Sequence, residues 1–178
     1  MAKNYYNQNT GTGDIIKLAV VAVVIAIVGY GIFTVCFTPK KTTETHLVVQ
    51  AIAESGYEAE DLTQTYYQHD PWFEHSLIKC VAFNENDLHF EFLEFNNDNS
   101  AWDIHTQAVQ LIAEEHNLQG RRKHRGTRIS NYSDYFFESN GKYSITVWVG
   151  NTVLYAYSNS ENAHVMNRII DDIGYLEY

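Results

Sequence analysis

The fold is decided by the stretch at residues 142–157, which reads KYSITVWVGNTVLYAY. In its first half the odd-numbered residues 143–149 are apolar or aromatic, and the residues between them are mostly small or polar. Period-two alternation of β-branched and aromatic residues predicts a strand with one buried face. Gly150-Asn151 interrupts the pattern where a tight turn would lie. We therefore predict an antiparallel pair of strands, at residues 142–149 and 152–157.

Further strands are predicted on the N-terminal side of this pair. Asn140-Gly141 is the dipeptide that a type I′ hairpin prefers, and it follows a strand-like run around residues 129–137. Two more apolar runs, residues 77–83 and 88–95, flank the turn residues 84–87. Hairpin-length connections require antiparallel pairing, so the sequence predicts an antiparallel sheet of about five strands.

Three amphipathic helices are predicted around these strands. The first starts within residues 42–45 and ends at Gly56, the second occupies residues 102–117, and the third occupies residues 161–173. Each has apolar residues at helical spacing on one side. The predicted fold class is α+β, with one domain at residues 42–178 in which the three helices pack on one face of the sheet.

An apolar stretch near the N-terminus has a different character: residues 18–37 read LAVVAVVIAIVGYGIFTVCF. As an α-helix this run would be roughly 30 Å long, the thickness of the hydrocarbon core of a bilayer. We therefore predict a single transmembrane helix at residues 18–38. The polar residues 1–17 before it are predicted to be a disordered N-terminal tail.

The orientation of the predicted anchor is not decided by charge, because two lysines flank the apolar run on each side. An apolar segment this close to the start resembles an uncleaved signal-anchor, which exports the rest of the chain. No small-x-small cleavage site comes after the run, and Phe33-Thr34-Val35 before Cys36 is a poor match to lipoprotein processing. The prediction is a single-pass protein of the cell membrane whose soluble domain is extracytoplasmic and part of the cell envelope.

Charge is distributed unevenly along the chain. The first 41 residues hold four lysines and one aspartate, a net charge of +3, which leaves −13 for residues 42–178 out of −10 for the whole chain. So acidic a domain is repelled by phosphate backbones, and broad nucleic-acid binding is therefore excluded.

Several short motifs in the domain resemble those of small, uncharacterised membrane-anchored or lipoprotein-type proteins of Gram-positive bacteria. The motifs are two helix ends that close on Gly-Tyr, an Asn-Gly hairpin and one strand, namely Ser55-Gly56-Tyr57, Leu62-Thr63, Asn140-Gly141, Asn151-Thr152-Val153-Leu154-Tyr155-Ala156 and Gly174-Tyr175. The resemblance covers most of the chain from about residue 44. It implies an envelope location and no known activity.

One histidine-rich segment is a candidate metal site. His69, Asp70, Glu74 and His75 bring two imidazoles and two carboxylates into one short segment. Their spacing matches no recognised zinc pattern, so a polar loop is the preferred interpretation and no cofactor is predicted. The chain also lacks a Gly-x-Ser-x-Gly elbow, a His-Glu-x-x-His motif and a phosphate-binding glycine loop, so we predict that it is not an enzyme. Cys80, in an apolar run, is predicted to be an inert core thiol.

The basic stretch at residues 121–128 stands out from the acidic background. It holds five of the domain's eight Lys and Arg residues and no acid: Arg121, Arg122, Lys123, Arg125 and Arg128. We predict an exposed loop here, which suits lipid headgroups, an anionic polymer or an acidic partner. A solvated loop, or one neutralised by neighbouring acids, is the alternative interpretation.

The sequence therefore favours a membrane-anchored, non-enzymatic binding or interaction module at the outer face of the cell membrane. Its partner would be a protein or an anionic component of the envelope. Two alternatives are a metal-dependent protein or enzyme that uses residues 69–75, and a membrane-tethered immunity or inhibitor protein whose acidic surface neutralises a basic toxin. The oligomeric state is not predicted.

Overall fold

The computed structural model describes residues 12–37, 39–115 and 120–176, except for the side chains of residues 12–18 and 32–37. The chain divides into two compact units, Met1–Thr38 and Pro39–Tyr178, and each is described by itself. The sheet and every described helix after the first belong to the second unit.

The first unit contains the helix α1 (Thr12–Phe37), in which residues 19–31 have exposed side chains. A membrane-spanning helix needs about twenty successive apolar residues, and the stretch of α1 with described side chains is shorter than that. In the described part of the chain, no helix combines the length and the apolar character that crossing a membrane requires. This finding corrects the predicted transmembrane helix at residues 18–38 and the single-pass, signal-anchor topology built on it. Of the predicted tail, residues 1–11 lie outside the description and residues 12–17 belong to α1.

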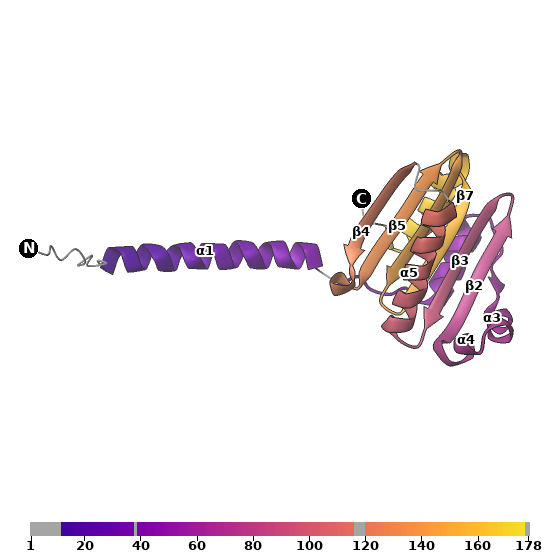
Figure 1. Cartoon of the computed structure of the whole chain (residues 1–178), viewed down its shortest axis with the longest axis horizontal. Helices are drawn as coiled ribbons and strands as arrows, with labels where there is room; N and C mark the ends of the chain where they lie inside the picture. The colour runs from indigo at the N-terminus through magenta and orange to yellow at the C-terminus, as the bar shows by residue number, and fades with distance from the viewer. Residues whose placement is uncertain (1–11, 38, 116–119, 177–178) are drawn as a thin grey trace, which may run out of the picture. The chain divides into compact units, whose positions relative to one another are not determined.

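The second unit is an α+β domain built on a seven-stranded, fully antiparallel sheet (Figure 1). The strand order is β1-β2-β3-β7-β6-β5-β4. The strands are β1 (Glu60–Asp61), β2 (Leu77–Glu85), β3 (Leu88–Phe95), β4 (Arg121–Thr127), β5 (Tyr132–Ser139), β6 (Lys142–Val149) and β7 (Thr152–Asn159).

Tight turns join the consecutive strands, and their backbone angles explain the residues used. Asn140 and Gly141 between β5 and β6 have φ of 51° and 75°, and two positive φ values are what a type I′ turn requires. Asn86 and Asp87 between β2 and β3 repeat the pattern with φ of 50° and 66°. Gly150 adopts φ of 52° between β6 and β7. These three hairpins lie where the sequence predicts them.

Helices cover both faces of the sheet, which corrects the prediction that all three pack on one face. The helices α2 (Thr45–Glu54) and α6 (Ala163–Asp172) bury Val48, Ile52 and Ile169 against one face. The long helix α5 (Asp98–Glu115) crosses the other face, as Figure 1 shows, and buries Ile112 there. The two short helices α3 (Thr63–His69) and α4 (Pro71–Ser76) lie beside β2 on the α5 face.

The second buried face has a physical cause in β6. The pattern predicts that the even-numbered residues Ser144, Thr146 and Trp148 face solvent, yet all three are buried together with the apolar residues of the other face. Trp148 packs at 4.8 Å against Trp102 of α5, and Thr146 lies 3.1 Å from the imidazole Nδ1 of His105. Short polar side chains can line a buried face when a helix supplies hydrogen-bonding partners.

The sheet has seven strands, not about five, because β1 and β4 carry no apolar alternation. Both are edge strands that pair through backbone groups on one side, so their side chains need not fit a core. The basic stretch predicted to be a loop is therefore β4, followed by a 3-10 turn at Arg128–Ser130. A Cβ atom at Gly126 would lie 2.2 Å from the Tyr132 carbonyl oxygen, so β4 needs glycine there to approach β5.

Candidate anion-binding site at the sheet edge

Alternate residues of β4 point to the sheet face that α6 covers. Arg121, Lys123 and Arg125 line a hollow of about 400 Å³. Its walls come from β5, β6 and α6 and include Phe136 and Tyr143. Side chains two residues apart on a strand share one face, roughly 7 Å apart along it. The alternation of the strand therefore places Arg121, Lys123 and Arg125 together on one face, beside the rings of Phe136 and Tyr143.

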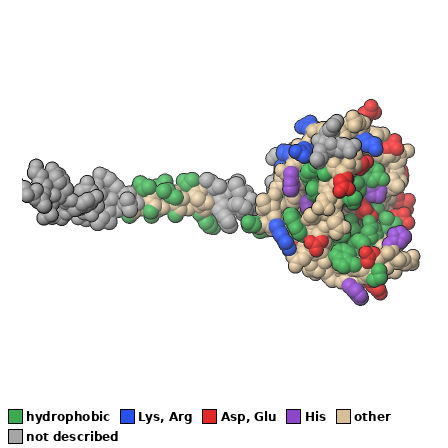
Figure 2. Space-filling model, viewed as in Figure 1, with side chains coloured by type: hydrophobic (Ala, Val, Ile, Leu, Met, Phe, Trp, Pro, Cys, Tyr) green, Lys and Arg blue, Asp and Glu red, His purple; other side chains and the backbone are tan. Residues whose placement is uncertain are grey.

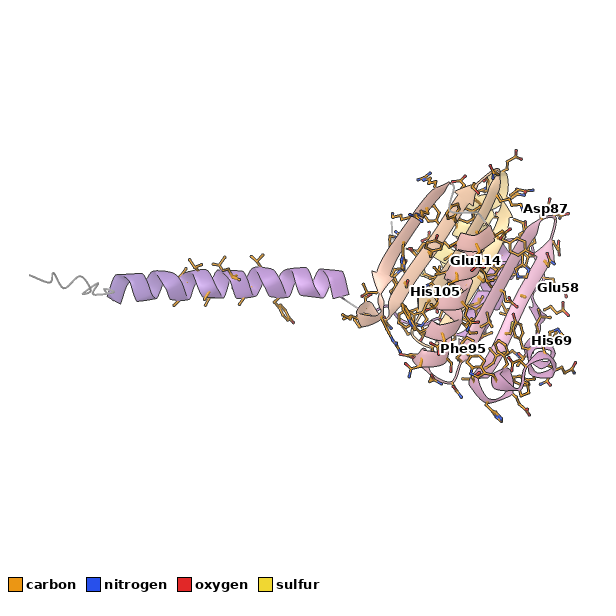
Figure 3. All side chains as sticks on the ribbon, in the orientation of Figure 1. Glu58, His69, Asp87, Phe95, His105 and Glu114 are labelled. Carbon is orange, nitrogen blue, oxygen red and sulfur yellow. The ribbon has the colours of Figure 1, made fainter. Side chains whose placement is uncertain are left out.

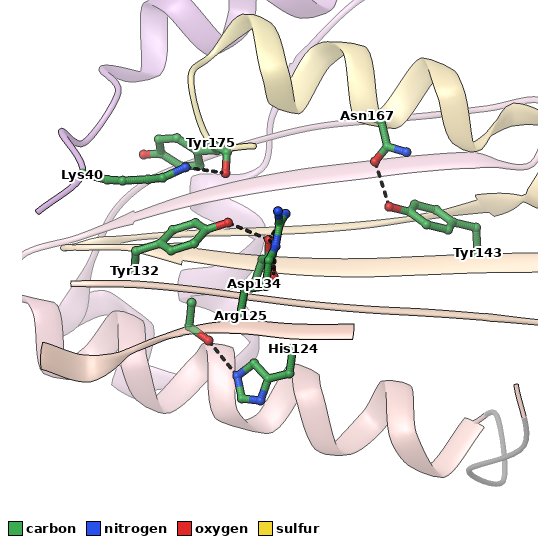
Figure 4. Close-up of polar contacts among 9 residues, drawn as sticks. Lys40, His124, Arg125, Tyr132, Asp134, Tyr143, Asn167 and Tyr175 are labelled. Atoms are coloured by element: carbon green, nitrogen blue, oxygen red, sulfur yellow. Dashed lines mark hydrogen bonds and ion pairs between the residues drawn. The ribbon is translucent and has the colours of Figure 1, made fainter. Parts of the chain in front are cut away.

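Arg125 forms an ion pair with the buried carboxylate of Asp134, which stabilises the fold (Figure 4). Its Nε lies 2.8 Å from Asp134 Oδ2, and its Nη2 also donates to that oxygen. The Asp134 side chain is 1% exposed, and the Tyr132 hydroxyl donates a further hydrogen bond of 2.6 Å to it. The Lys40 ammonium lies 4.1 Å from the Tyr132 ring centre. The Arg125 guanidinium is therefore engaged in an ion pair with Asp134, and we assign it a structural role rather than a role in ligand binding.

Arg121 and Lys123 remain as the cations that can meet a ligand. Both are exposed, and neither forms an ion pair with any residue that the structure describes. The Arg121 guanidinium carbon lies 6.0 Å from the centre of the Phe136 ring. Glu138, which faces Arg121 in the strand register, also lines the hollow and offsets part of its charge.

The floor of the hollow is fixed by a hydrogen bond between the sheet and α6. The Tyr143 hydroxyl donates to the Asn167 side-chain oxygen at 2.8 Å (Figure 4). Burial raises the pKa of Tyr143, so the phenol stays neutral and acts as a donor. This contact joins β6 to α6 in the lining of the hollow.

The other basic residues of the predicted patch lie elsewhere. Arg128 follows β4 and contacts α5, where its Nη2 donates to Asn99 Oδ1 and its guanidinium carbon lies 5.7 Å from the Trp102 ring centre. Arg122 alternates with the hollow-lining residues and is exposed. Figure 2 shows Lys and Arg side chains gathered mainly at the β4 side of the domain, and acidic side chains spread over the rest of that face. The five predicted residues therefore do not form one site.

His105 of α5 is buried against the sheet, and no pattern in the sequence indicates this contact (Figure 3). The Nε2 atoms of His105 and His124 both lie 3.0 Å from the Ser133 hydroxyl, and His105 Nδ1 contacts Thr146. Burial lowers the pKa of His105 to about 4, with a smaller contribution from His124, while Asp134 opposes the shift. His105 is therefore neutral near pH 7, and its contacts serve packing between α5 and the sheet.

The histidine-rich segment that is the candidate metal site forms the end of α3 and the helix α4 (Figure 3 labels His69). Asp70 caps α4, since its Oδ1 accepts a hydrogen bond of 2.8 Å from the Trp72 amide. Among the residues that the structure describes, no group of three or more His, Cys, Asp or Glu side chains could hold a metal ion. His69, Asp70, Glu74 and His75 are thus not brought together around one point.

Comparisons with known proteins provide no family for this chain. No protein-family model and no curated protein sequence matches it. Among solved structures, it is similar to the crystal structure of a GTP-binding regulator from Thermotoga maritima, with 9% sequence identity and a TM-score of 0.40. That similarity covers 80% of this chain and 96% of the other. At this level of similarity it carries no argument about fold or function.

Proposed function

We propose that the domain is a non-enzymatic interaction module that binds an acidic, extended segment of another protein at the β4 edge of its sheet. The observation that carries the proposal is the pair Arg121 and Lys123, unpaired by any described acid, on a seven-residue edge strand of a domain with a net charge of −13. A cationic strip on an acidic body favours acidic partners over basic ones.

Edge-strand geometry supplies the second part of the argument. β4 is the last strand in the order and pairs only with β5 among the described strands, so backbone N–H and C=O groups along its other side face outward. Such an edge accepts a peptide as an additional strand, with main-chain hydrogen bonds giving affinity and side-chain contacts giving specificity. The hollow beside Phe136 lies where alternate side chains of the added strand would point.

Basic side chains on this edge also discourage unwanted pairing. Two β4 edges from two copies of the chain would bring Arg and Lys side chains together, and like charges directly opposite each other are destabilising. An acidic strand removes that repulsion and replaces it with cross-strand ion pairs. Specificity would thus come from repulsion of basic edges as well as attraction of acidic ones.

The proposal is tested with a capped peptide of about eight residues in which glutamate and valine alternate, titrated into the isotope-labelled full chain. We expect amide shifts and slower amide exchange along β4, and weaker binding as salt rises. Replacing both Arg121→Gln and Lys123→Gln should weaken binding roughly twofold to thirtyfold, since exposed ion pairs contribute about 0.2–1 kcal/mol each. Arg128→Gln is the matched control and should leave the affinity unchanged.

Two further peptides separate strand addition from general charge attraction. A glutamine-for-glutamate peptide should bind more weakly, and a glutamate peptide with prolines in place of valines should not bind, because proline cannot supply the ladder of N–H groups. Equal binding of all three peptides, or shifts confined to regions away from β4, would contradict the proposal. The compartment of the domain and the inhibitor alternative stay predictions from the sequence.

A further inference from the structure

A second hollow, of about 300 Å³, lies on the α5 face of the sheet, opposite the face that the first hollow occupies. It is enclosed by α3 and α4, by α5, and by β3 and β7. Most of its lining is apolar or aromatic and includes Tyr66, Phe73, Leu93 and Tyr155. Its volume is at the lower end of the range for small-molecule sites, roughly 300–1,000 Å³.

One carboxylate, that of Glu91, lines this apolar hollow. The Glu91 side chain is 13% exposed. Its Oε1 accepts a hydrogen bond of 2.6 Å from the Tyr66 hydroxyl, and the Cys80 thiol lies 3.6 Å from the same oxygen. Its Oε2 is 3.7 Å from His89 Nε2, which exceeds the length of a hydrogen bond. The acid therefore has one well-satisfied oxygen and one with only a distant partner.

The surroundings of Glu91 keep it ionised. Burial raises the pKa of Glu91, but contacts with His89 and Tyr66 lower it by more, so it ends below its ordinary value. Burial, with the neighbouring Glu91 charge, raises the pKa of both Tyr66 and Cys80, so these two groups stay neutral donors. The hollow is thus an apolar chamber with a fixed negative charge in its wall.

The geometry points to a binding site for a small primary amine with an aromatic or aliphatic arm, whose ammonium group meets Glu91 and whose arm fills the space between α5 and β7. An ammonium group can both donate a hydrogen bond to the Glu91 carboxylate and neutralise its charge, whereas an alcohol brings no positive charge and a second carboxylate is repelled. Aromatic rings beside the acid add cation–π attraction for an ammonium group. The negative charge of the domain raises the local concentration of cations. Glu115 adds negative charge near this hollow, since it contributes to the raised pKa of Tyr155 in its lining.

Three probes with the same phenylethyl arm test the site in the full chain by calorimetry and by NMR: 2-phenylethylamine, 2-phenylethanol and 3-phenylpropanoate. The amine should bind at least tenfold more tightly than the alcohol, and the acid should not bind. Glu91→Gln, which keeps an acceptor for Tyr66, should weaken the amine roughly tenfold to a hundredfold and leave the alcohol unchanged. Glu94→Gln makes the same charge change on β3 at a residue that does not line the hollow and should have no effect.

A second variant keeps the test decisive if Glu91→Gln folds poorly. Ala108 of α5 lines the hollow, and Ala108→Phe should fill it and abolish amine binding while Glu91 remains in place. Equal affinity for amine and alcohol would overturn the inference. So would amine binding that survives Ala108→Phe, which would mean general attraction of a cation to the acidic surface, or no amine binding at millimolar concentration. None of these results bears on the peptide site at β4, which uses other residues on the opposite face.

Discussion

Two carboxylates of the sheet, the buried Asp134 on β5 and the largely buried Glu91 on β3, differ in their partners. Asp134 is 1% exposed and accepts hydrogen bonds from two nitrogens of Arg125 and from the hydroxyl of Tyr132. Glu91 is 13% exposed and receives one strong hydrogen bond, from Tyr66, with His89 at 3.7 Å. A fully satisfied buried charge supports the fold, whereas a partly satisfied one beside a cavity can still take a ligand.

The same contrast divides the basic residues. Arg125 has a buried counter-ion, so removing it leaves a charge unpaired in the interior. Arg121 and Lys123 are exposed at the rim of the hollow, and neither has an ion-pair partner among the described residues, so removing either leaves no buried charge behind. A combined replacement of all the basic residues would therefore mix loss of folding with loss of binding. Replacing them singly separates these two effects.

The largest expected effect is that of Arg125→Gln. Breaking a buried ion pair by removing one partner costs about 3–5 kcal/mol, because the Asp134 carboxylate is left in the interior without its counter-ion. Urea unfolding measures the loss. The double variant Arg125→Gln with Asp134→Asn should recover part of it, and a loss below about 1 kcal/mol for the single variant would mean that Asp134 is not buried in the folded protein.

The second expected effect concerns pH and the α5 face. His105 has a pKa of about 4 in the fold against 6.5 when exposed, so the unfolded chain binds more protons between these values. Stability from this residue is therefore present above pH 6.5 and is lost as pH falls toward 4, by about 3 kcal/mol. His105→Gln should flatten this part of the stability profile. Identical pH profiles for the two proteins would refute the assignment.

The third expected effect tests the approach of β4 to β5. Gly126→Ala places a Cβ 2.2 Å from the Tyr132 carbonyl oxygen at a φ of 82°, so we expect a loss of about 2 kcal/mol or more in the free energy of unfolding. Gly141→Ala is the matched control, since its φ is also positive but its Cβ would meet open space. Equal losses for the two variants would show that backbone strain alone matters.

The smallest expected effect completes the comparison with Arg125. Arg121→Gln and Lys123→Gln should each change the free energy of unfolding by less than about 0.5 kcal/mol, because exposed side chains without ion-pair partners contribute little. Thermal unfolding of each single variant provides the measurement. A loss of stability as large as that of Arg125→Gln would show that these residues stabilise the fold, and would contradict their assignment to the proposed binding site.

The sequence predicts the hairpins but not most of the sites, because the sites depend on contacts between residues far apart in the chain. His105 lies in the helix predicted at residues 102–117, but nothing local indicates that it contacts Thr146, forty-one positions away, in the interior. Glu91 lies in the apolar run HFEFLEF, where an acid among alternating aromatic residues is the available signal. That signal is weak because the domain is rich in acids, and periodicity alone does not say which helix covers the residue.

The sequence by itself determined five of the seven antiparallel strands and the three tight turns between them, because alternation and the positive φ values of Asn140-Gly141 are local properties. Only the tertiary structure decided that helices cover both faces and that Glu91 borders a cavity. It also decided that Arg125 pairs with Asp134, while Arg121 and Lys123 have no ion-pair partner among the described residues. These outcomes depend on strand register and on the path of α5 across the sheet, which join residues far apart in the chain. Local patterns carry no information about which distant side chain completes a contact.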